Sequence, residues 1–443
     1  MDLTPKKIVE YLDDFIIGQD EAKKAIAIAL RNRWRRLQLE GEMREEVLPK
    51  NILMIGPTGV GKTEIARRMA KLLKLPFVKV EATKYTEVGF VGRDVESMVR
   101  DLVYDAIRLA KDEELSRQEP ELAEYICEKI AAELVPNLPK GAAAEKIERQ
   151  KTAKNAMKER VRSQAADHLR VEIEVSPKTH IDAMGLDNLP PEMARLQESL
   201  GKMFGQMNQP IKREVSVAEA KELLRNEASE RLVDMEKVRR EALKRASEGG
   251  IIFIDEMDKI AVGAAAARSG DPSKEGVQRD LLPIVEGSSV STKYGNIETD
   301  HILFIGAGAF SMTKPSDLIA ELQGRFPLRV EMLSLDEAAL YSILTTPKNS
   351  LVKQYAALLA VEGVTIEFTD DALRAMAALA KQANDKTEDI GARRLHTVME
   401  KALEEISFAA DEKRGETIAI TADFVHSKLD KLFESDDSTR YIL

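Results

Sequence analysis

A glycine-rich loop between an apolar run and an amphipathic run constrains this chain more than any other feature. Residues 56–63 read Gly-Pro-Thr-Gly-Val-Gly-Lys-Thr and match the phosphate-loop pattern G-x-x-x-x-G-K-[ST]. Residues 51–55 predict a buried strand, and residues 64–73 carry apolar side chains at helical spacing. Such a loop and the helix start behind it bind phosphate through backbone N–H groups and partial positive charge. We expect Lys62 to contact the β- and γ-phosphates and Thr63 to hold Mg²⁺.

Five short apolar runs predict the strands of one sheet. They are residues 52–55, 77–80, 251–254, 302–305 and 328–330. Helical patterns separate them, so the sheet is expected to be parallel, with strands buried on both faces and nearly continuously hydrophobic. The first, third and fourth runs have that character. The fold class is therefore α/β.

Two further parts are expected to be helical. Residues 111–246 are rich in Ala, Glu, Lys, Arg and Gln, which predicts an inserted helical domain. Its Met-rich stretch, residues 184–209, is either a soft contact surface or a disordered loop. Residues 333–443 predict a separate, mostly helical domain. The expected division is 1–110 with 247–332 for the nucleotide-binding domain, 111–246 for the insertion and 333–443 for the C-terminal domain.

Local patterns mark element boundaries in the C-terminal part. Ser334 is followed three residues later by Glu337, which predicts a capping box. Thr369 precedes two Asp residues and predicts another helix start. Residues 364–368 and 417–421 are expected to pair as a small two-stranded element.

Two carboxylates follow the third apolar run. Asp255 and Glu256 come directly after residues 251–254. In a protein with a phosphate loop, such a strand end is the Walker B element, in which Asp255 is expected to hold Mg²⁺ through water beside Thr63. Glu256 is then placed to orient and activate an attacking water. The pair predicts ATP hydrolysis rather than phosphoryl transfer to a small acceptor.

Composition excludes several classes of protein. A net charge of -10 argues against a general nucleic-acid binder. Cys127 is the only cysteine, which excludes an intramolecular disulfide and a cysteine zinc site. No run approaches the roughly 18 apolar residues of a membrane span, and the first residues lack an apolar signal core. We expect a cytoplasmic protein that binds no membrane.

The helix expected over residues 21–39 carries four arginines, at positions 31, 33, 35 and 36. These could contact nucleic acid. A solvated or subunit-facing helix surface is the simpler interpretation.

Taken together, the motifs resemble the AAA+ ATPases. The Asp-Glu pair, the helical C-terminal domain and the Gly-Ala-Arg-Arg run at 391–394 are typical of that superfamily. The resemblance implies a P-loop sheet of strand order 5-1-4-3-2 and a ring hexamer. Within the superfamily the chain resembles the HslU (ClpY) family, the bacterial ATPases that work with HslV-type peptidases. The segments that carry this closer resemblance are 16–20, 31–36, 87–92, 276–283 and 391–396. It covers nearly the whole chain and identifies the insertion as an intermediate domain and the C-terminal domain as a lid.

The resemblance implies roles for residues of the nucleotide site. Ile17 lies against the adenine, and Arg393 is the sensor 2 residue on the lid of the same subunit. Arg325 is the arginine finger that reaches a neighbour's γ-phosphate, a contact worth roughly 10³–10⁵ in rate. Glu321 lies at the same subunit boundary. The ATP phosphates are bound by Gly59, Val60, Gly61, Lys62, Thr63 and Glu64.

Two other segments resemble the family's substrate and partner contacts. The run Gly89, Phe90, Val91 and Gly92 resembles the pore loop that grips a polypeptide; the family usually has Tyr at the position of Phe90, so the aromatic ring is kept and the hydroxyl is lost. The tail residues Tyr441, Ile442 and Leu443 resemble the segment that docks between peptidase subunits.

One position departs from the superfamily pattern. AAA+ proteins often place Asn, Thr or Ser, the sensor 1 residue, at the end of the fourth strand. Residues 305–309 read Ile-Gly-Ala-Gly-Ala and offer no polar side chain. A backbone group or a nearby residue then does that work, or γ-phosphate sensing is weaker.

The resemblance implies an ATP-dependent protein unfoldase that forms a homohexamer. It would take unfolded or tagged protein substrates, feed them to an HslV-type peptidase, and bind no nucleic acid. Three alternatives remain. A ClpX-like unfoldase needs a cysteine zinc module that one cysteine cannot form, and a DNA-remodelling motor conflicts with the acidic charge balance. A non-catalytic scaffold conflicts with the presence of both Glu256 and Arg325.

Overall fold

The computed structural model describes seven stretches of the chain. They are residues 4–36, 38–47, 50–86, 93–135, 144–175, 211–262 and 272–434. The chain divides into two compact units, of which the first comprises 1–109 with 239–443 and the second comprises 110–238.

A five-stranded sheet lies at the centre of the first unit, in the order β2-β5-β8-β1-β9. All neighbouring strands are parallel. The strands are β1 (Ile52–Ile55), β2 (Phe77–Glu81), β5 (Ile251–Asp255), β8 (Leu303–Gly308) and β9 (Leu328–Glu331). Numbered along the chain, the five strands lie in the order 2-3-4-1-5. This is the expected order 5-1-4-3-2 seen from the opposite edge, so the α/β fold class and all five strands are confirmed.

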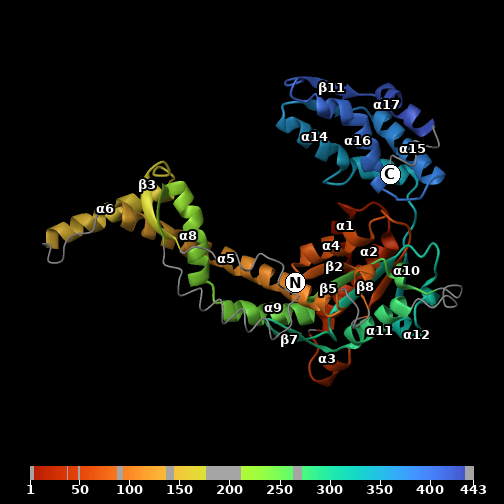
Figure 1. Cartoon of the computed structure of the whole chain (residues 1–443), viewed down its shortest axis with the longest axis horizontal. Helices are drawn as coiled ribbons and strands as arrows, with labels where there is room; N and C mark the ends of the chain where they lie inside the picture. The colour runs from red at the N-terminus through yellow and green to blue at the C-terminus, as the bar shows by residue number, and fades with distance from the viewer. Residues whose placement is uncertain are drawn as a thin grey trace. The chain divides into compact units, whose positions relative to one another are not determined.

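Both faces of the sheet are buried, which explains the continuous apolar runs. Ile251, Phe253 and Ile305 point to one face, where they join the core formed with α1 (Pro5–Asp13), α2 (Asp20–Arg36) and α4 (Lys62–Leu73). Ile252 and Phe304 alternate with them and are equally buried on the other face. Figure 1 shows helices on both sides of the strands, with α2 and α4 on one side and α11 (Pro272–Glu286) and α12 (Ala320–Arg325) on the other.

Shorter elements complete this part of the unit. They are α3 (Glu42–Glu46), η1 (Ala82–Lys84), α10 (Met257–Ile260), β6 (Ser289–Thr292), β7 (Gly295–Glu298) and η5 (Pro315–Asp317). Strands β6 and β7 form an antiparallel hairpin that the sequence did not predict. Each of its strands buries only one side chain, Val290 or Ile297, so no apolar run marks it.

The C-terminal part of the first unit is mostly helical. Its elements are α13 (Glu337–Thr345), α14 (Leu351–Val361), β10 (Thr365–Phe368), α15 (Asp370–Lys386), α16 (Arg393–Phe408), β11 (Thr417–Ile420) and α17 (Ala422–Glu434). Strands β10 and β11 pair as predicted, and in parallel. Thr369 caps α15 as predicted, because its side chain accepts a hydrogen bond from the N–H of Ala372.

The predicted capping box at Ser334 is wrong. Helix α13 begins at Glu337, and the Asp336 side chain accepts the capping hydrogen bond from the N–H of Ala339 at 2.7 Å. The backbone N–H and C=O of Leu333 are both bonded to the Gln19 side chain, which holds the chain ahead of Asp336 outside the helix.

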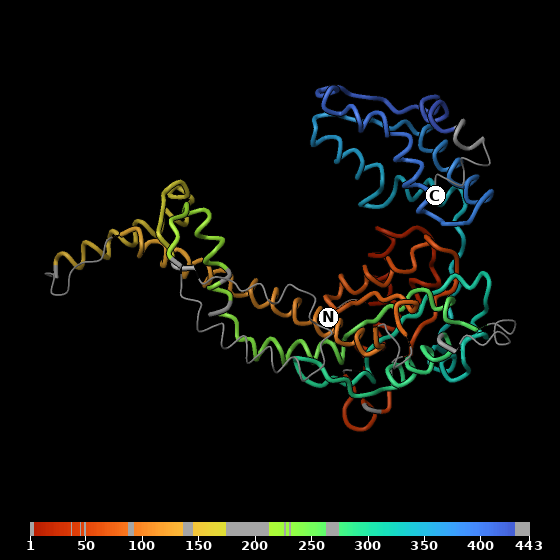
Figure 2. The backbone as a smooth tube through the Cα atoms, viewed as in Figure 1, coloured from red at the N-terminus to blue at the C-terminus, as the bar shows by residue number. Residues whose placement is uncertain are grey.

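The second unit consists of helices and a two-stranded ribbon. Its elements are the greater part of α5 (Ser97–Leu134), α6 (Ala144–Arg162), β3 (Arg170–Val175), β4 (Ile211–Ser216), α8 (Val217–Leu232) and the start of α9 (Met235–Gly249). Leu122 and Ile130 of α5 share a core with Val171 of β3 and Leu224 of α8. In Figure 2, α5, α6 and β3 run from orange to yellow, and α8 and α9 are green. The antiparallel β3–β4 ribbon was not predicted, and the Met-rich stretch 184–209 lies outside the described residues.

Two of the four arginines on α2 correct the surface interpretation. Arg33 is 8% exposed, and its guanidinium donates to the carbonyl oxygens of Gly250 at 2.8 Å and Glu248 at 2.9 Å. Burial lowers the pKa of Arg33 to about 9, which leaves it charged at neutral pH. Arg36 is also buried and donates to the carbonyl oxygen of Arg44 at 2.8 Å. Arg33 therefore fastens α2 to the chain entering β5, and Arg36 fastens it to α3, so these two side chains are not a solvated face.

Candidate functional site

The glycine-rich loop joins β1 to α4 at the carboxyl edge of the parallel sheet. Gly56, Gly59 and Gly61 all have positive φ, at 151°, 76° and 101°. At Gly59 a Cβ atom would lie 2.0 Å from the carbonyl oxygen of Ile390, so glycine is required there by a close approach as well as by conformation. Helix α4 begins at Lys62, which directs its N-terminal N–H groups into the loop.

Lys62 is buried within this loop. Its ammonium donates to the carbonyl oxygens of Gly56 at 2.5 Å and Pro57 at 2.7 Å. Burial lowers the pKa of Lys62; the carboxylates of Asp255 and Asp258 oppose that effect, and the positive charge of Arg393 adds to it. Charged groups from two other segments, one holding Asp255 and Asp258 and the other Arg393, therefore act electrostatically on Lys62.

The Asp-Glu pair follows β5 at the same edge of the sheet. The Asp255 carboxylate forms an ion pair with Lys79 at 2.9 Å, and its other oxygen accepts from the N–H of Glu256 at 3.1 Å. Glu256 has the left-handed backbone conformation, at φ 59°. Its carboxylate accepts a hydrogen bond from the Thr83 hydroxyl at 2.8 Å. In the part of the chain that the structure describes, no three His, Cys, Asp or Glu residues are grouped to hold a metal.

Glu64 contacts side chains of its own helix. Its carboxylate accepts from Arg67, and from Arg68 at 2.6 Å. Burial raises the pKa of Glu64, but the hydrogen bonds from these arginines outweigh burial and lower it overall. The Arg68 guanidinium also lies 4.1 Å from the centre of the Phe15 ring, which connects α4 to the segment around Ile17.

The segment that contains Ile17 is fixed from two sides. Lys23 is 1% exposed and donates to the carbonyl oxygen of Ile16 at 2.7 Å and to Asp13 at 2.6 Å. The Gln19 side-chain amide donates to the carbonyl oxygen of Leu333 at 2.8 Å and accepts from its N–H at 3.0 Å. Sequence reasoning missed Lys23 and Gln19. A polar residue directly after the Gly18 turn was the only available signal for Gln19.

The turn before α16 contacts the phosphate loop directly. The N–H of Ala392 donates to the carbonyl oxygen of Gly59 at 3.1 Å. Gly391 has φ 57°, and a Cβ atom there would lie 2.7 Å from the carbonyl oxygen of Thr58. Arg393 is exposed at the start of α16. Arg394 is 1% exposed and donates to Asn384 and Thr387, so only Arg393 of the two arginines is available to a ligand.

Glu321 and Arg325 lie one turn apart on α12, and both are exposed. Arg325 donates to the Glu286 carboxylate at 2.9 Å. Among the hydrogen bonds of the described residues, none joins Glu321 or Arg325 to the phosphate loop. The structure thus lets the charges of Asp255 and Arg393 act on Lys62 and leaves Glu321 and Arg325 at the surface.

Two predicted segments lie outside the described residues. They are the pore-loop residues Gly89, Phe90, Val91 and Gly92 and the tail residues Tyr441, Ile442 and Leu443. The chain on either side of the first segment is paired, since Tyr85 and Arg93 form an isolated parallel bridge. The N–H of Thr86 donates to the carbonyl oxygen of Arg93 at 3.3 Å.

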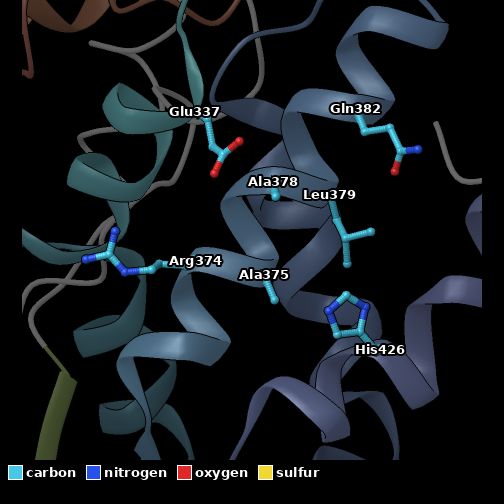
Figure 3. A pocket seen from close by; sticks show the side chains of 7 residues that line it. All are labelled: Glu337, Arg374, Ala375, Ala378, Leu379, Gln382 and His426. Carbon is cyan, nitrogen blue, oxygen red and sulfur yellow. The ribbon is translucent and has the colours of Figure 1, made fainter.

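A cavity of about 500 Å³ lies between α13, α15 and α17 (Figure 3). Glu337, Arg374 and His426 contribute to its wall. None of the predicted site residues lines this cavity, so it is separate from the nucleotide site. In the described stretches, no helix has both the length and the apolar character that crossing a bilayer requires.

Two family models match the chain. The AAA domain (dynein-related subfamily) matches residues 51–107, and the AAA domain (Cdc48 subfamily) matches residues 178–329. The first match contains the phosphate loop, and the second contains the Asp-Glu pair and Arg325. The matched regions therefore cover both halves of the candidate site.

Curated relatives match over the whole length. The ATP-dependent protease ATPase subunit HslU of Helicobacter pylori (strain J99) is 57% identical, over 100% of this chain and 99% of the relative. The protein of the same name from Campylobacter jejuni (strain RM1221) is 55% identical, over 100% of both chains. At this identity over the complete chain, the protein belongs to the HslU family of AAA+ ATPases.

Proposed function

We propose that this chain is the ATP-hydrolysing subunit of a two-component protease, and that it unfolds protein substrates and feeds them to a separate HslV-type peptidase ring. One observation carries the proposal. The phosphate loop, the Asp-Glu pair and the lid turn converge, with the Ala392 N–H on the Gly59 carbonyl and the Lys62 ammonium within the electrostatic reach of Asp255 and Arg393. We infer that this turn shifts when nucleotide enters or leaves the loop that it contacts.

The residues of the site divide the work of ATP hydrolysis. The N–H groups from Gly59 to Glu64 bind the phosphates, and Lys62 exchanges its two carbonyl contacts for phosphate oxygens. The Thr63 hydroxyl and the Asp255 carboxylate are oxygen ligands of the kind Mg²⁺ prefers, so the donor set fits that ion. Mg²⁺ supplies charge neutralisation at the phosphates. Glu256 orients the attacking water as a general base.

The adenine ring and the γ-phosphate of ATP are contacted by residues on either side of the phosphate loop. Ile17 packs against the adenine, in a segment that Lys23 and Gln19 hold in place. Arg393 reaches the phosphates from the lid of the same subunit. Gln19 lies two residues after Ile17 and is hydrogen-bonded to Leu333, where the chain enters the C-terminal lid. Adenine binding at Ile17 is therefore linked to the position of the lid.

The exposed face of α12 belongs to a boundary between copies of the chain. We infer a homohexameric ring in which Arg325 reaches the γ-phosphate of the neighbouring subunit and Glu321 lies beside it. In the single chain Arg325 is paired with Glu286, and both side chains are about half exposed, at 46% and 40%. Exposed pairs of this kind contribute about 0–1 kcal/mol, so Arg325 can exchange Glu286 for a phosphate at little cost.

Substrate and partner contacts complete the proposal. The loop from Gly89 to Gly92 presents Phe90 to an unfolded or tagged polypeptide in the ring pore. An aromatic side chain contacts any sequence, which suits a translocating motor. The tail residues Tyr441 to Leu443 dock onto the peptidase, in the cytoplasm.

The proposal is tested by replacing the general base. In a Glu256→Gln variant we expect ATP to bind with normal affinity, because the amide keeps the size of the side chain. ATP turnover should fall by about 10²–10⁴-fold. Degradation of a folded substrate by the cognate HslV-type peptidase should stop as well. The matched control is Glu241→Gln on α9, which removes only a surface pair with Arg245. Undiminished degradation by the Glu256→Gln ring would refute the proposal.

A further inference from the structure

The peptide group between Gly308 and Ala309 is bound on both sides at the end of β8. Its carbonyl oxygen accepts from the N–H of Gly56 at 3.1 Å. Its N–H donates to the Asp258 carboxylate at 3.2 Å. A peptide group is planar and rigid. This one peptide therefore connects Asp258 to the first glycine of the phosphate loop without any intervening soft torsion.

Asp258 is buried, and a further hydrogen bond fixes its backbone. It is 8% exposed, lies in α10 three residues after Asp255, and its own carbonyl oxygen accepts from the Thr313 hydroxyl at 3.1 Å. A buried carboxylate is costly unless it is hydrogen-bonded. The Asp258 charge also acts on Lys62, whose ammonium donates to the carbonyl oxygen of Gly56 at 2.5 Å. Asp258 thus reaches the phosphate loop both by hydrogen bonding and by charge.

Gly308 leaves the space that Asp258 fills. A Cβ atom at Gly308 would lie 2.8 Å from the Asp258 carboxylate oxygen and 2.6 Å from the Phe310 ring. A side chain on the last residue of β8 therefore cannot coexist with Asp258 in its present place. The same crowding leaves no room for a polar side chain at Gly308 itself.

We propose that Asp258 is a positioning residue for ATP hydrolysis and takes the place of the missing polar side chain at the end of β8. It holds the Gly308–Ala309 peptide, and through that peptide Gly56, so that Lys62 and Glu256 meet the same γ-phosphate. The inference rests on the proposed roles of Lys62 and Glu256. A misplacement of about 1 Å in such a site can cost about 10²-fold in rate, which makes a hydrogen bond of this kind matter for turnover.

Two substitutions at Asp258 separate its hydrogen bond from its charge. Asp258→Asn keeps an oxygen that accepts from Ala309, so kcat for ATP should stay within about 3-fold of the unchanged protein. Asp258→Ala removes the acceptor, and kcat should fall about 10–100-fold. The KM for ATP and the Kd for ADP should change by less than about 3-fold in both variants, because the phosphate-binding N–H groups remain. Gly308→Ala displaces the same carboxylate from the other side and should reproduce the loss of kcat.

The matched control is Asp105→Ala. Asp105 also accepts a hydrogen bond from a backbone N–H, that of Phe77 at 3.0 Å, but at the opposite end of the sheet. We expect its kcat to be unchanged. If Asp258→Ala fails to fold, Gly308→Ala decides by the same measurement.

Three results would overturn the inference. They are a kcat in Asp258→Ala within about 3-fold of normal, a loss of ADP affinity as large as the loss of kcat, or an Asn variant as slow as the Ala variant. Lys62→Ala distinguishes this failure from a failure of the proposed function. If Lys62→Ala still hydrolyses ATP, the site assignment is wrong. If Lys62→Ala is inactive while Asp258→Ala is normal, only the role of Asp258 is wrong.

Discussion

Asn51 shows how one residue holds the phosphate-loop strand in the sheet. It precedes β1 and is 6% exposed. Its side-chain oxygen accepts from the N–H of Phe304 in β8 at 3.0 Å, and its amide donates to the carbonyl oxygen of Arg325 at 3.0 Å. A single side chain thus ties the start of β1 to the neighbouring strand and to the end of α12.

Asn51→Ala should destabilise the protein through those two lost partners. A buried backbone group left without a hydrogen bond costs about 1–3 kcal/mol, and we expect a loss of at least that size in the free energy of unfolding. Urea unfolding followed by circular dichroism measures it. Asn296→Ala, at an exposed position of β7, is the control and should change little. Equal stability of the two variants would contradict the bridging role of Asn51.

Individual side chains mark the limit of what the sequence could predict. Lys62, Asp255 and Arg393 could be proposed because a motif or a family resemblance names them, and their roles stay predictions. Arg33 was misinterpreted because its partners, the carbonyls of Glu248 and Gly250, lie more than two hundred positions away. No local pattern reveals such partners, and an arginine on a helix looks the same in a sequence whether it is solvated or buried.

At the scale of elements, strands that are buried on both faces of the sheet were easier to predict from the sequence than strands that are buried on one face. The three central strands β1, β5 and β8 were predicted because they are nearly continuously apolar, whereas β2 and β9 were predicted from shorter apolar runs. The β6–β7 hairpin was missed because each of its strands buries only one side chain. Strand β3 of the β3–β4 ribbon does alternate apolar and charged residues, but the composition of residues 111–246 favoured helix there. The turn at Gly391 was singled out from a motif, but its contact with Gly59 could not be, since it joins elements from opposite ends of the chain.

Gly391→Ala should disturb the contact between the lid turn and the phosphate loop. The added Cβ would lie 2.7 Å from the carbonyl oxygen of Thr58, so the turn must move away from the loop. We expect the KM for ATP to rise and turnover to fall, each by about 10-fold, which corresponds to about 1.4 kcal/mol. Steady-state ATPase assays measure both quantities.

Gly415→Ala is the control for this element. Gly415 also has a positive φ, of 87°, but a Cβ atom there would meet nothing within 4 Å. It therefore carries the same kind of backbone strain without the contact. ATPase parameters that change equally in both variants would show that strain, and not the contact with Thr58, is responsible.

At the scale of the whole molecule, the single chain holds an incomplete catalytic set. The charges of Asp255 and Arg393 act on Lys62, whereas Arg325 is exposed on α12 and paired with Glu286. The sequence predicted this separation only through the family resemblance, because no spacing along a chain distinguishes a group that acts within a subunit from one that acts on a neighbour. A ring in which each subunit completes the next accounts for the exposed position of Arg325.

Mixing two inactive variants tests that completion. Lys62→Ala subunits cannot bind the phosphates but keep Arg325, and Arg325→Ala subunits keep the site but lack the finger. Each variant alone should be nearly inactive, since the finger is worth about 10³–10⁵ in rate. In mixed rings, some Lys62→Ala subunits offer Arg325 to an Arg325→Ala neighbour. The catalytic site at each such boundary then has both Lys62 and Arg325, so ATP turnover should reappear on mixing. The double variant Lys62→Ala/Arg325→Ala, mixed with Arg325→Ala in the same way, supplies no finger and should restore nothing. If the first mixture is as inactive as the second, Arg325 does not act between subunits, and its exposed position on α12 needs another explanation.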